Sequence, residues 1–331
     1  MRILKLKKGE NNCITDVHGV QVGHVSLYEK LDNQTTICTG VTAILPHHNN
    51  LFRHKVHAGS AVLNGFGKTT GLIQVNELGL LESPIMLTNT FSVGAVWQGT
   101  LDYMLGATEE IGDTTSSINI VVGECNDSYL NTVRYPSVKP EHAIEAIESA
   151  RPSPVVEGAV GAGKGMVCFG YKGGIGTASR IVKHESTSYQ IGCLILSNFG
   201  NREDALFANW EPVKQDTPDG SIMIILATDA PLLERQLQRL SKRCAAGLGR
   251  TGSHLDNGSG DIALAFSTAT TISHTWDQIT HTVDFLRDDH PLMNQLFQAV
   301  VEIVEESIIR SLQMGQTTVG RMGRIVEKAP L

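Results

Sequence analysis

The fold is decided by the stretch Gly247-Leu-Gly-Arg-Thr-Gly-Ser-His-Leu-Asp-Asn-Gly-Ser-Gly-Asp-Ile-Ala-Leu-Ala-Phe-Ser267. It leaves a helical pattern, passes through a glycine-rich loop and enters an apolar strand pattern directly after Ser259. Here Ser259 stands between Gly258 and Gly260, two residues whose backbones reach φ/ψ values closed to others. A serine hydroxyl in such a loop is placed to attack the carbonyl carbon of the preceding residue.

Self-cleavage is the chemistry that this loop allows. If the Ser259 hydroxyl takes over the acyl group of Gly258 and the ester is hydrolysed, Ser259 becomes a new N-terminus. Its freed α-amine, with an unperturbed pKa of about 7.7 to 8.0, is then a base suited to activating its own hydroxyl. From spacing alone a flexible surface loop remains the alternative, because Asn-Gly and Gly-Ser-Gly are ordinary turn sequences.

Strand and helix patterns extend outward on both sides of the loop. Short runs rich in β-branched residues predict buried strands at 40–45, 84–87, 117–122, 166–169, 191–197, 221–227 and 261–267. Three helices are predicted at 92–105, 229–246 and 291–314, the second with Asp229 as its cap and Pro231 in its first turn. This mixture predicts layered sheets covered by helices, in one domain over residues 1–331.

Composition excludes several classes of protein. The 331 residues are 41% hydrophobic, and 33 aperiodic glycines describe a globular chain with tight turns, not a collagen or a linker. A formal net charge of -7 gives no electrostatic reason to expect nucleic acid or an anionic membrane surface as a partner. No apolar run matches a secretory signal or a membrane span, so we expect a cytoplasmic protein.

The sequence predicts neither a metal site nor a cofactor. Six scattered cysteines without a C-x-x-C pair indicate reduced core thiols. A histidine-rich loop, with no acidic or cysteine cluster beside it, indicates surface side chains; its members are His47, His48, His54 and His57. The run from Gly158 to Lys164 fits G-x-x-x-x-G-K, but Gly165 stands where a nucleotide-binding loop has Ser or Thr. Close backbone approach in a turn explains these glycines better.

Further motifs follow one another from residue 14 to about residue 314. They are Thr15-Asp-Val-His-Gly-Val-Gln-Val-Gly-His24, Asn64-Gly-Phe-Gly67, Pro84-Ile-Met-Leu-Thr-Asn-Thr90, Val122-Gly-Glu-Cys-Asn-Asp127, Glu157-Gly-Ala-Val-Gly-Ala-Gly163 and Asn257-Gly-Ser-Gly-Asp-Ile262. In this order they resemble the DmpA family, the L-aminopeptidase/D-esterase and β-peptidyl aminopeptidase enzymes of peptidase family S58. The resemblance implies an α/β fold, a four-layer αββα sandwich like that of Ntn hydrolases. It also implies a precursor that cuts itself between Gly258 and Ser259, leaving residues 1–258 as the large chain and 259–331 as the small one.

The resemblance assigns roles to individual side chains. Ser259 is the nucleophile, and the Asn198 amide, in an Asn-Phe-Gly stretch after a strand, donates to the oxyanion. Tyr129 resembles a tyrosine that lines the family's active site and donates a second hydrogen bond; packing at a strand end is its alternative. In the last helix a carboxylate orients the amine of Ser259, and we favour Glu306 over Glu305. A solvated helix face is the alternative for both glutamates.

Three residues depart from the family pattern. Val304 stands where the family has a serine or threonine before the acidic pair, which predicts slower processing or activity. Lys68 replaces an acidic residue and Lys164 a hydroxyl residue, and both are expected to alter the substrate pocket. Glu124 is a candidate for the carboxylate that anchors a substrate ammonium.

The predicted activity is removal of N-terminal residues from small peptides, amides or esters through an acyl-enzyme, without a cofactor. The resemblance implies a homo-oligomer, typically a tetramer of processed heterodimers. One alternative is an acyltransferase of the ornithine acetyltransferase type, whose nucleophile is threonine where this chain has serine. Another is an unprocessed, non-catalytic binding protein.

Overall fold

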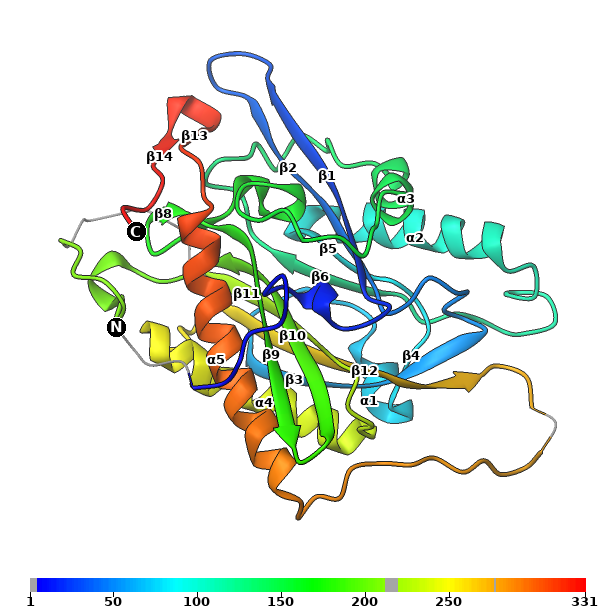
Figure 1. Ribbon diagram of the computed structural model, residues 1–331. Coiled ribbons are helices and arrows are strands. Elements are labelled where there is room, and N and C mark those ends of the chain that lie inside the picture. Colours follow the sequence, from blue (N-terminus) through cyan, green and yellow to red (C-terminus); the bar gives the residue numbers. More distant parts are fainter. Residues whose placement is uncertain (1–4, 212–219, 277) are drawn as a thin grey trace.

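The computed structural model describes residues 5–211, 220–276 and 278–331. Two β-sheets stack face to face, and helices cover the outer surface of each (Figure 1). One apolar core lies between the sheets, and one further core lies between each sheet and the helices that cover it. The predicted four-layer αββα sandwich is confirmed.

The six-stranded sheet carries the loop that contains Ser259. Its strands, in spatial order, are β4 (Leu80–Leu81), β3 (His54–Gly65), β12 (Gly260–Ser273), β11 (Ser221–Thr228), β10 (Thr187–Asn198) and β9 (Gly174–His184). All neighbours are antiparallel except β11 and β12. On β12, Ile262 and Leu264 face the core between the sheets, while Ala263 and Ala265 face the helices. This alternation follows from the two-residue period of a strand.

The second sheet has four strands, in the order β1 (Gln21–Lys30), β2 (Thr36–Leu45), β5 (Ile85–Asn89) and β6 (Val121–Cys125). Every residue of β2, β5 and β6 is buried. Strands covered on both faces are apolar throughout instead of alternating, which explains why short apolar runs revealed them in the sequence.

The helices divide between the two sheets. On the four-stranded sheet lie α2 (Val93–Ala107) and α3 (Pro140–Glu148), and on the six-stranded sheet lie α4 (Glu234–Thr251) and α5 (Pro291–Gln313). Smaller elements are α1 (Leu72–Leu78), the ribbons β7 (Val167–Cys168) with β8 (Tyr171–Lys172) and β13 (Thr318–Val319) with β14 (Ile325–Val326), and the 3-10 turns η1 (Ile14–Asp16), η2 (Thr90–Ser92), η3 (Gly161–Gly165), η4 (Arg202–Asp204) and η5 (Arg321–Gly323).

Several predicted boundaries are wrong. Helix α4 begins at Glu234 with Leu233 as its cap, because Asp229 is engaged elsewhere. Its carboxylate accepts a 2.6 Å hydrogen bond from the backbone N–H of Gln190, which ties it to β10. The strand predicted at 117–122 begins only at Val121, and that at 166–169 is reduced to the two residues of β7. The long strands β1, β3 and β9 were not predicted, since glycine and polar residues interrupt their apolar pattern.

The cysteine prediction is confirmed, and the histidine prediction is partly wrong. All six cysteines are free and buried. His47 is buried, with Nε2 2.7 Å from the carbonyl oxygen of His54, and His57 is half-buried. Within the described residues, no group of His, Cys, Asp and Glu has the arrangement to hold a metal ion.

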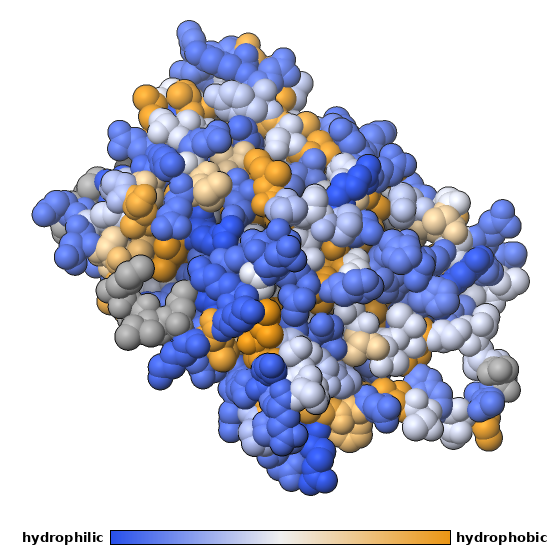
Figure 2. Space-filling model, in the orientation of Figure 1, coloured by the Kyte–Doolittle hydropathy of each residue, from blue (hydrophilic) through white to orange (hydrophobic). Residues whose placement is uncertain are grey.

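The predicted absence of a secretory signal and of a membrane span concerns the start of the chain and its helices. Residues 1–4, where the sequence argument about a signal begins, lie outside the described residues. No helix in the described part of the chain has the length and apolarity to cross a membrane. The face shown in Figure 2 is mostly hydrophilic, with apolar side chains in separated patches.

The glycines at 158–163 serve close packing, as predicted. A Cβ atom on Gly158 would lie 2.2 Å from the carbonyl oxygen of Met314, and Gly158 has a positive φ of 82°. A Cβ on Gly163 would lie 2.7 Å from the Gly158 oxygen. Only residues without a side chain allow these backbones to approach so closely.

Candidate active site

Strand register brings the predicted nucleophile and oxyanion donor to one edge of the six-stranded sheet. The last residue of β10, Asn198, pairs with Ser221 on β11, which pairs with Gly260 on β12. Neighbouring strands lie about 4.8 Å apart, so Asn198 and the start of β12 are roughly 10 Å apart. The other end of β12 leads into the extended segment at the right of Figure 1.

Ser259 lies in a tight, hydrogen-bonded turn. Its side chain is 3% exposed, and its backbone N–H donates to the carbonyl oxygen of Asp256 at 2.8 Å. The Asn64 amide on β3 donates to the carbonyl oxygens of Asp256 at 2.8 Å and of Ser259 at 2.5 Å. The turn is thus clamped on both sides of the bond between Gly258 and Ser259, unlike a flexible surface loop.

The expected backbone strain lies elsewhere in this turn. Neither Gly258 nor Gly260 has a positive φ, whereas Leu255 has a φ of 56°. A non-glycine residue in this left-handed region is uncommon. Gly260 instead permits close contact, because a Cβ atom there would lie 2.9 Å from the Phe66 oxygen.

Asp261 is a site residue that sequence reasoning missed. The Ser259 hydroxyl donates to its Oδ1 at 2.7 Å, and the Asp261 side chain is 1% exposed. Burial raises the pKa of Asp261 to about 6, with a smaller upward effect of Asp256 and a lowering effect of the hydrogen bond from Ser259. Its only signal in the sequence is its place two residues after Ser259, at the start of the strand that follows the loop.

Asn198 and Tyr129 lie in one pocket at this edge. Its lining comprises Asn126, Tyr129, Val167, Gly170, Asn198, Phe199, Gly200, Asn201, Gly220 and Asp256. Asn198 is held at both ends: Oδ1 accepts from the Val167 N–H at 2.9 Å and Nδ2 donates to the Asn126 oxygen at 3.0 Å. The half-buried Tyr129 packs its ring under the Arg324 guanidinium, 4.6 Å from the ring centroid.

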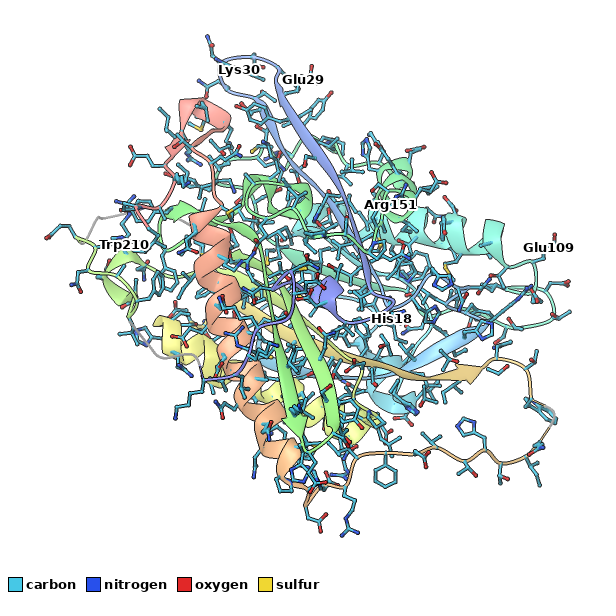
Figure 3. The ribbon with its side chains drawn as sticks, viewed as in Figure 1. His18, Glu29, Lys30, Glu109, Arg151 and Trp210 are labelled. Atoms are coloured by element: carbon cyan, nitrogen blue, oxygen red, sulfur yellow. The ribbon has the colours of Figure 1, made fainter. Side chains whose placement is uncertain are left out.

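A chain of aromatic rings packs against Phe199, which lines the pocket. Phe169 packs edge-on against Phe199 at 5.2 Å and against Phe207 at 5.4 Å between ring centroids. Trp210 packs against Phe207 at 5.3 Å and lies at the left edge of the molecule in Figure 3, opposite Glu109. These rings fix the loop that follows Asn198.

The two glutamates of α5 lie in different surroundings. Glu306 contacts Arg180 Nη2 at 2.6 Å, Lys8 Nζ at 2.5 Å and Asn12 Nδ2 at 2.9 Å. Glu305 is buried and forms an ion pair with Arg250 at 2.7 Å, at the end of α4 that leads into the Ser259 turn. The structure therefore does not bring Glu306 together with Ser259, and its proposed role stays a prediction.

None of the three residues that depart from the family pattern is among those that line the pocket. Val304 is fully buried and faces α4, where a Cβ on Gly247 would lie 2.7 Å from the Val304 Cβ. The side-chain nitrogens of Lys68 and Lys164 lie over the rings of Phe66 and Tyr28.

Glu124 is buried near the start of β12. Its Oε1 accepts from the backbone N–H of Lys68 at 2.8 Å, and its Oε2 accepts from the Thr90 hydroxyl. A Cβ on Gly67 would lie 3.6 Å from Glu124 Oε1 and 3.7 Å from the Gly260 Cα. Gly67 thus lies between this carboxylate and Gly260, the residue that follows the serine.

Comparison with known proteins identifies one family. The model of peptidase family S58 matches residues 12–326. The chain is 39% identical over 350 aligned residues to the beta-peptidyl aminopeptidase BapA of Sphingosinicella microcystinivorans, covering 98% of this chain and 87% of that protein.

Solved structures have the same fold. The PH0078 protein from Pyrococcus horikoshii OT3 is 48% identical, with a TM-score of 0.93 over 100% of this chain and 94% of that one. The L-aminopeptidase D-Ala-esterase/amidase from Ochrobactrum anthropi, described as a prototype for the serine aminopeptidases and a variant of the Ntn hydrolase fold, is 34% identical. Its TM-score is 0.89, over 99% of this chain and 93% of that one.

Proposed function

The chain belongs to peptidase family S58, and we propose that this serine aminopeptidase makes its own nucleophile by cutting the bond between Gly258 and Ser259. The observation that carries the proposal is the buried hydroxyl of Ser259, hydrogen-bonded in a clamped turn level with Asn198. The cut frees an α-amine on the residue that bears the hydroxyl. One residue then supplies both nucleophile and base.

The proposed reaction passes through an acyl-enzyme. The Ser259 hydroxyl attacks the carbonyl carbon after the substrate's first residue, and its α-amine takes the proton and passes it to the leaving amine. The Asn198 amide and the Tyr129 hydroxyl donate to the developing oxyanion, which their positions in one pocket support. Water then releases the acyl group and restores the hydroxyl.

Carboxylates near the site have two proposed tasks. Glu124, buried and close to the start of β12, anchors the substrate ammonium by charge attraction. Orientation of the Ser259 amine was predicted for Glu306 or Glu305. The ion pair between Glu305 and Arg250, at the end of α4 that precedes the Ser259 turn, makes Glu305 the better placed of the two.

Intact-mass spectrometry of the purified protein tests the proposal. We expect two chains, residues 1–258 and residues 259–331, with N-terminal sequencing of the small chain starting at Ser259-Gly-Asp-Ile262. A Ser259→Ala variant should stay uncut and inactive. A wild-type chain that persists uncut, or a Ser259→Ala variant with full activity, contradicts the proposal.

Substrate, partners and location are part of the same proposal. Small peptides, amides or esters with a free N-terminus are the proposed substrates, and product analysis with and without added amines separates hydrolysis from acyl transfer. We propose a cytoplasmic homo-oligomer, a tetramer of processed heterodimers, that binds neither nucleic acid nor membranes. Native mass spectrometry of the cut protein measures this assembly directly.

A further inference from the structure

We propose that Asp261 is the base that removes the proton from the Ser259 hydroxyl during self-cleavage, an inference that rests on the proposed cut after Gly258. Before the cut, the nitrogen of Ser259 is a peptide amide, whose lone pair is delocalised and does not accept a proton at neutral pH. The amine that serves the mature enzyme therefore cannot assist the first reaction. A different base must contact the hydroxyl.

Asp261 meets the geometric requirement for that base. The Ser259 Oγ lies 2.7 Å from Asp261 Oδ1, inside the range for direct proton transfer. Both side chains are buried, so bulk water does not compete for the hydroxyl. The second oxygen, Oδ2, is buried and has no hydrogen-bond partner within the described residues. Because this buried oxygen has no partner to stabilise its negative charge, the carboxylate accepts a proton more readily.

The steps balance in atoms and charge. Ser259 Oγ bonds to the Gly258 carbonyl carbon while its proton passes to Asp261 Oδ1. The tetrahedral intermediate collapses as the bond between that carbon and the Ser259 nitrogen breaks, and the nitrogen takes the proton from Asp261. Water then attacks the ester, Asp261 accepts a proton from it, and the Ser259 hydroxyl leaves with that proton. The products are the Gly258 carboxyl group and the free amine of Ser259.

The surroundings of Asp261 favour a base that works near neutral pH. Among the described residues, the titratable groups around it are Asp256 in the turn, Cys125 on β6 and the adjacent Glu124, which lies close to the start of β12. The polar groups near it from β3 and β11, Asn64 and Ser221, carry no charge. Burial raises the pKa of Asp261 to about 6, so the carboxylate is ionised at pH 7 and more basic than an ordinary aspartate.

Cell-free synthesis of wild-type, Asp261→Asn and Asp102→Asn chains tests the proposal. Samples quenched at intervals give the cut fraction by mass spectrometry. At pH 7 we expect Asp261→Asn to be cut at least ~100-fold more slowly than wild type, the size typical of a lost general base. Asp102→Asn, which removes an exposed carboxylate on α2, should stay within about threefold of wild type at this pH.

A pH series on the wild-type chain gives a second, variant-free measurement. The cleavage rate should rise with pH to half its maximum near pH 6 and level off above, because the base must be ionised. Equal rates for Asp261→Asn and wild type, or a wild-type rate unchanged between pH 5 and 7.5, overturn the role of Asp261. If Asp261→Asn fails to fold, shown by its thermal unfolding against Ser259→Ala, the pH series decides. An uncut wild type contradicts the proposed function itself.

Discussion

The guanidinium of Arg180 is fully buried, and its Nη2 lies 2.6 Å from Glu306 Oε2 while its Nε lies 3.0 Å from Glu302 Oε2. Arg180 pairs in the sheet with Ile191, near the end of β10 remote from Asn198. At ~3.3 Å per residue, the two positions lie roughly 20 Å apart along the strand. The carboxylate that the sequence assigned to the Ser259 amine thus neutralises a buried arginine near the other end of the sheet.

A Glu306→Gln substitution separates these two roles. Removing one partner of a buried arginine should lower the free energy of unfolding by roughly 3 kcal/mol. Self-cleavage and kcat should stay within about threefold of wild type, because Glu302 keeps Arg180 in place. Urea unfolding and steady-state kinetics measure the two effects. A 100-fold loss of kcat without loss of stability would restore the catalytic role of Glu306.

A Val304→Thr substitution, which introduces the hydroxyl residue of the family pattern, should not raise the activity. Val304 is buried in the core between α4 and α5, so a Val304→Thr hydroxyl has only its own helix backbone to bond. We expect a stability loss of about 1 to 2 kcal/mol and an unchanged rate of self-cleavage. Val300→Thr, on the same helix and in the same core, is the matched control and should behave alike. Faster cleavage in Val304→Thr alone would show that the hydroxyl reaches the site.

The sequence predicted the centre of the fold because burial on both faces leaves a continuous signal. Strands β10, β11 and β12 are apolar runs that meet at the residues flanking Ser259 and Asn198. Strand β9 stayed hidden, since it carries glycines and the buried Arg180, whose partners lie more than a hundred residues away. No local sequence pattern predicts an ion pair between residues so far apart in the chain.

The site divides in the same way. Ser259 was predicted from its glycine loop, whereas Asp261 was missed, although it follows the serine by only two residues. The surroundings of Glu306 were not predicted, because helical spacing shows which residues share one face of a helix but not which strand or helix packs against that face. The contact of Asn64 with the Ser259 turn was not predicted either, because it depends on the pairing of β3 with β12.

An Asn198→Ala substitution should lower kcat by ~100 to 1,000-fold, the usual effect of losing one oxyanion donor. Because Asn198 also accepts from the Val167 N–H, stability should fall by about 1 kcal/mol. Asn201→Ala is the control: this amide lines the same pocket but bonds only to Asp204 on the surface among the described residues. Equal kinetics for the two variants would exclude Asn198 as the donor.

Burial of His24 predicts a loss of stability in acid. The ring on β1 lies with Nδ1 2.9 Å from the Thr42 hydroxyl, and burial lowers the pKa of His24 to about 4 from 6.5. Between these values the unfolded chain binds a proton that the folded chain refuses, so stability falls as pH drops from 6.5 to 4. The full difference amounts to roughly 3 kcal/mol.

The test compares wild type with His24→Gln in urea at several pH values, because the raised pKa values of Asp127 and Asp261 act in the opposite direction in both proteins. The free energy of unfolding of wild type relative to the variant should be constant above pH 6.5 and should decline steadily as the pH falls from 6.5 to 4. If the difference between wild type and His24→Gln is the same at pH 4 and pH 7, His24 does not titrate with folding.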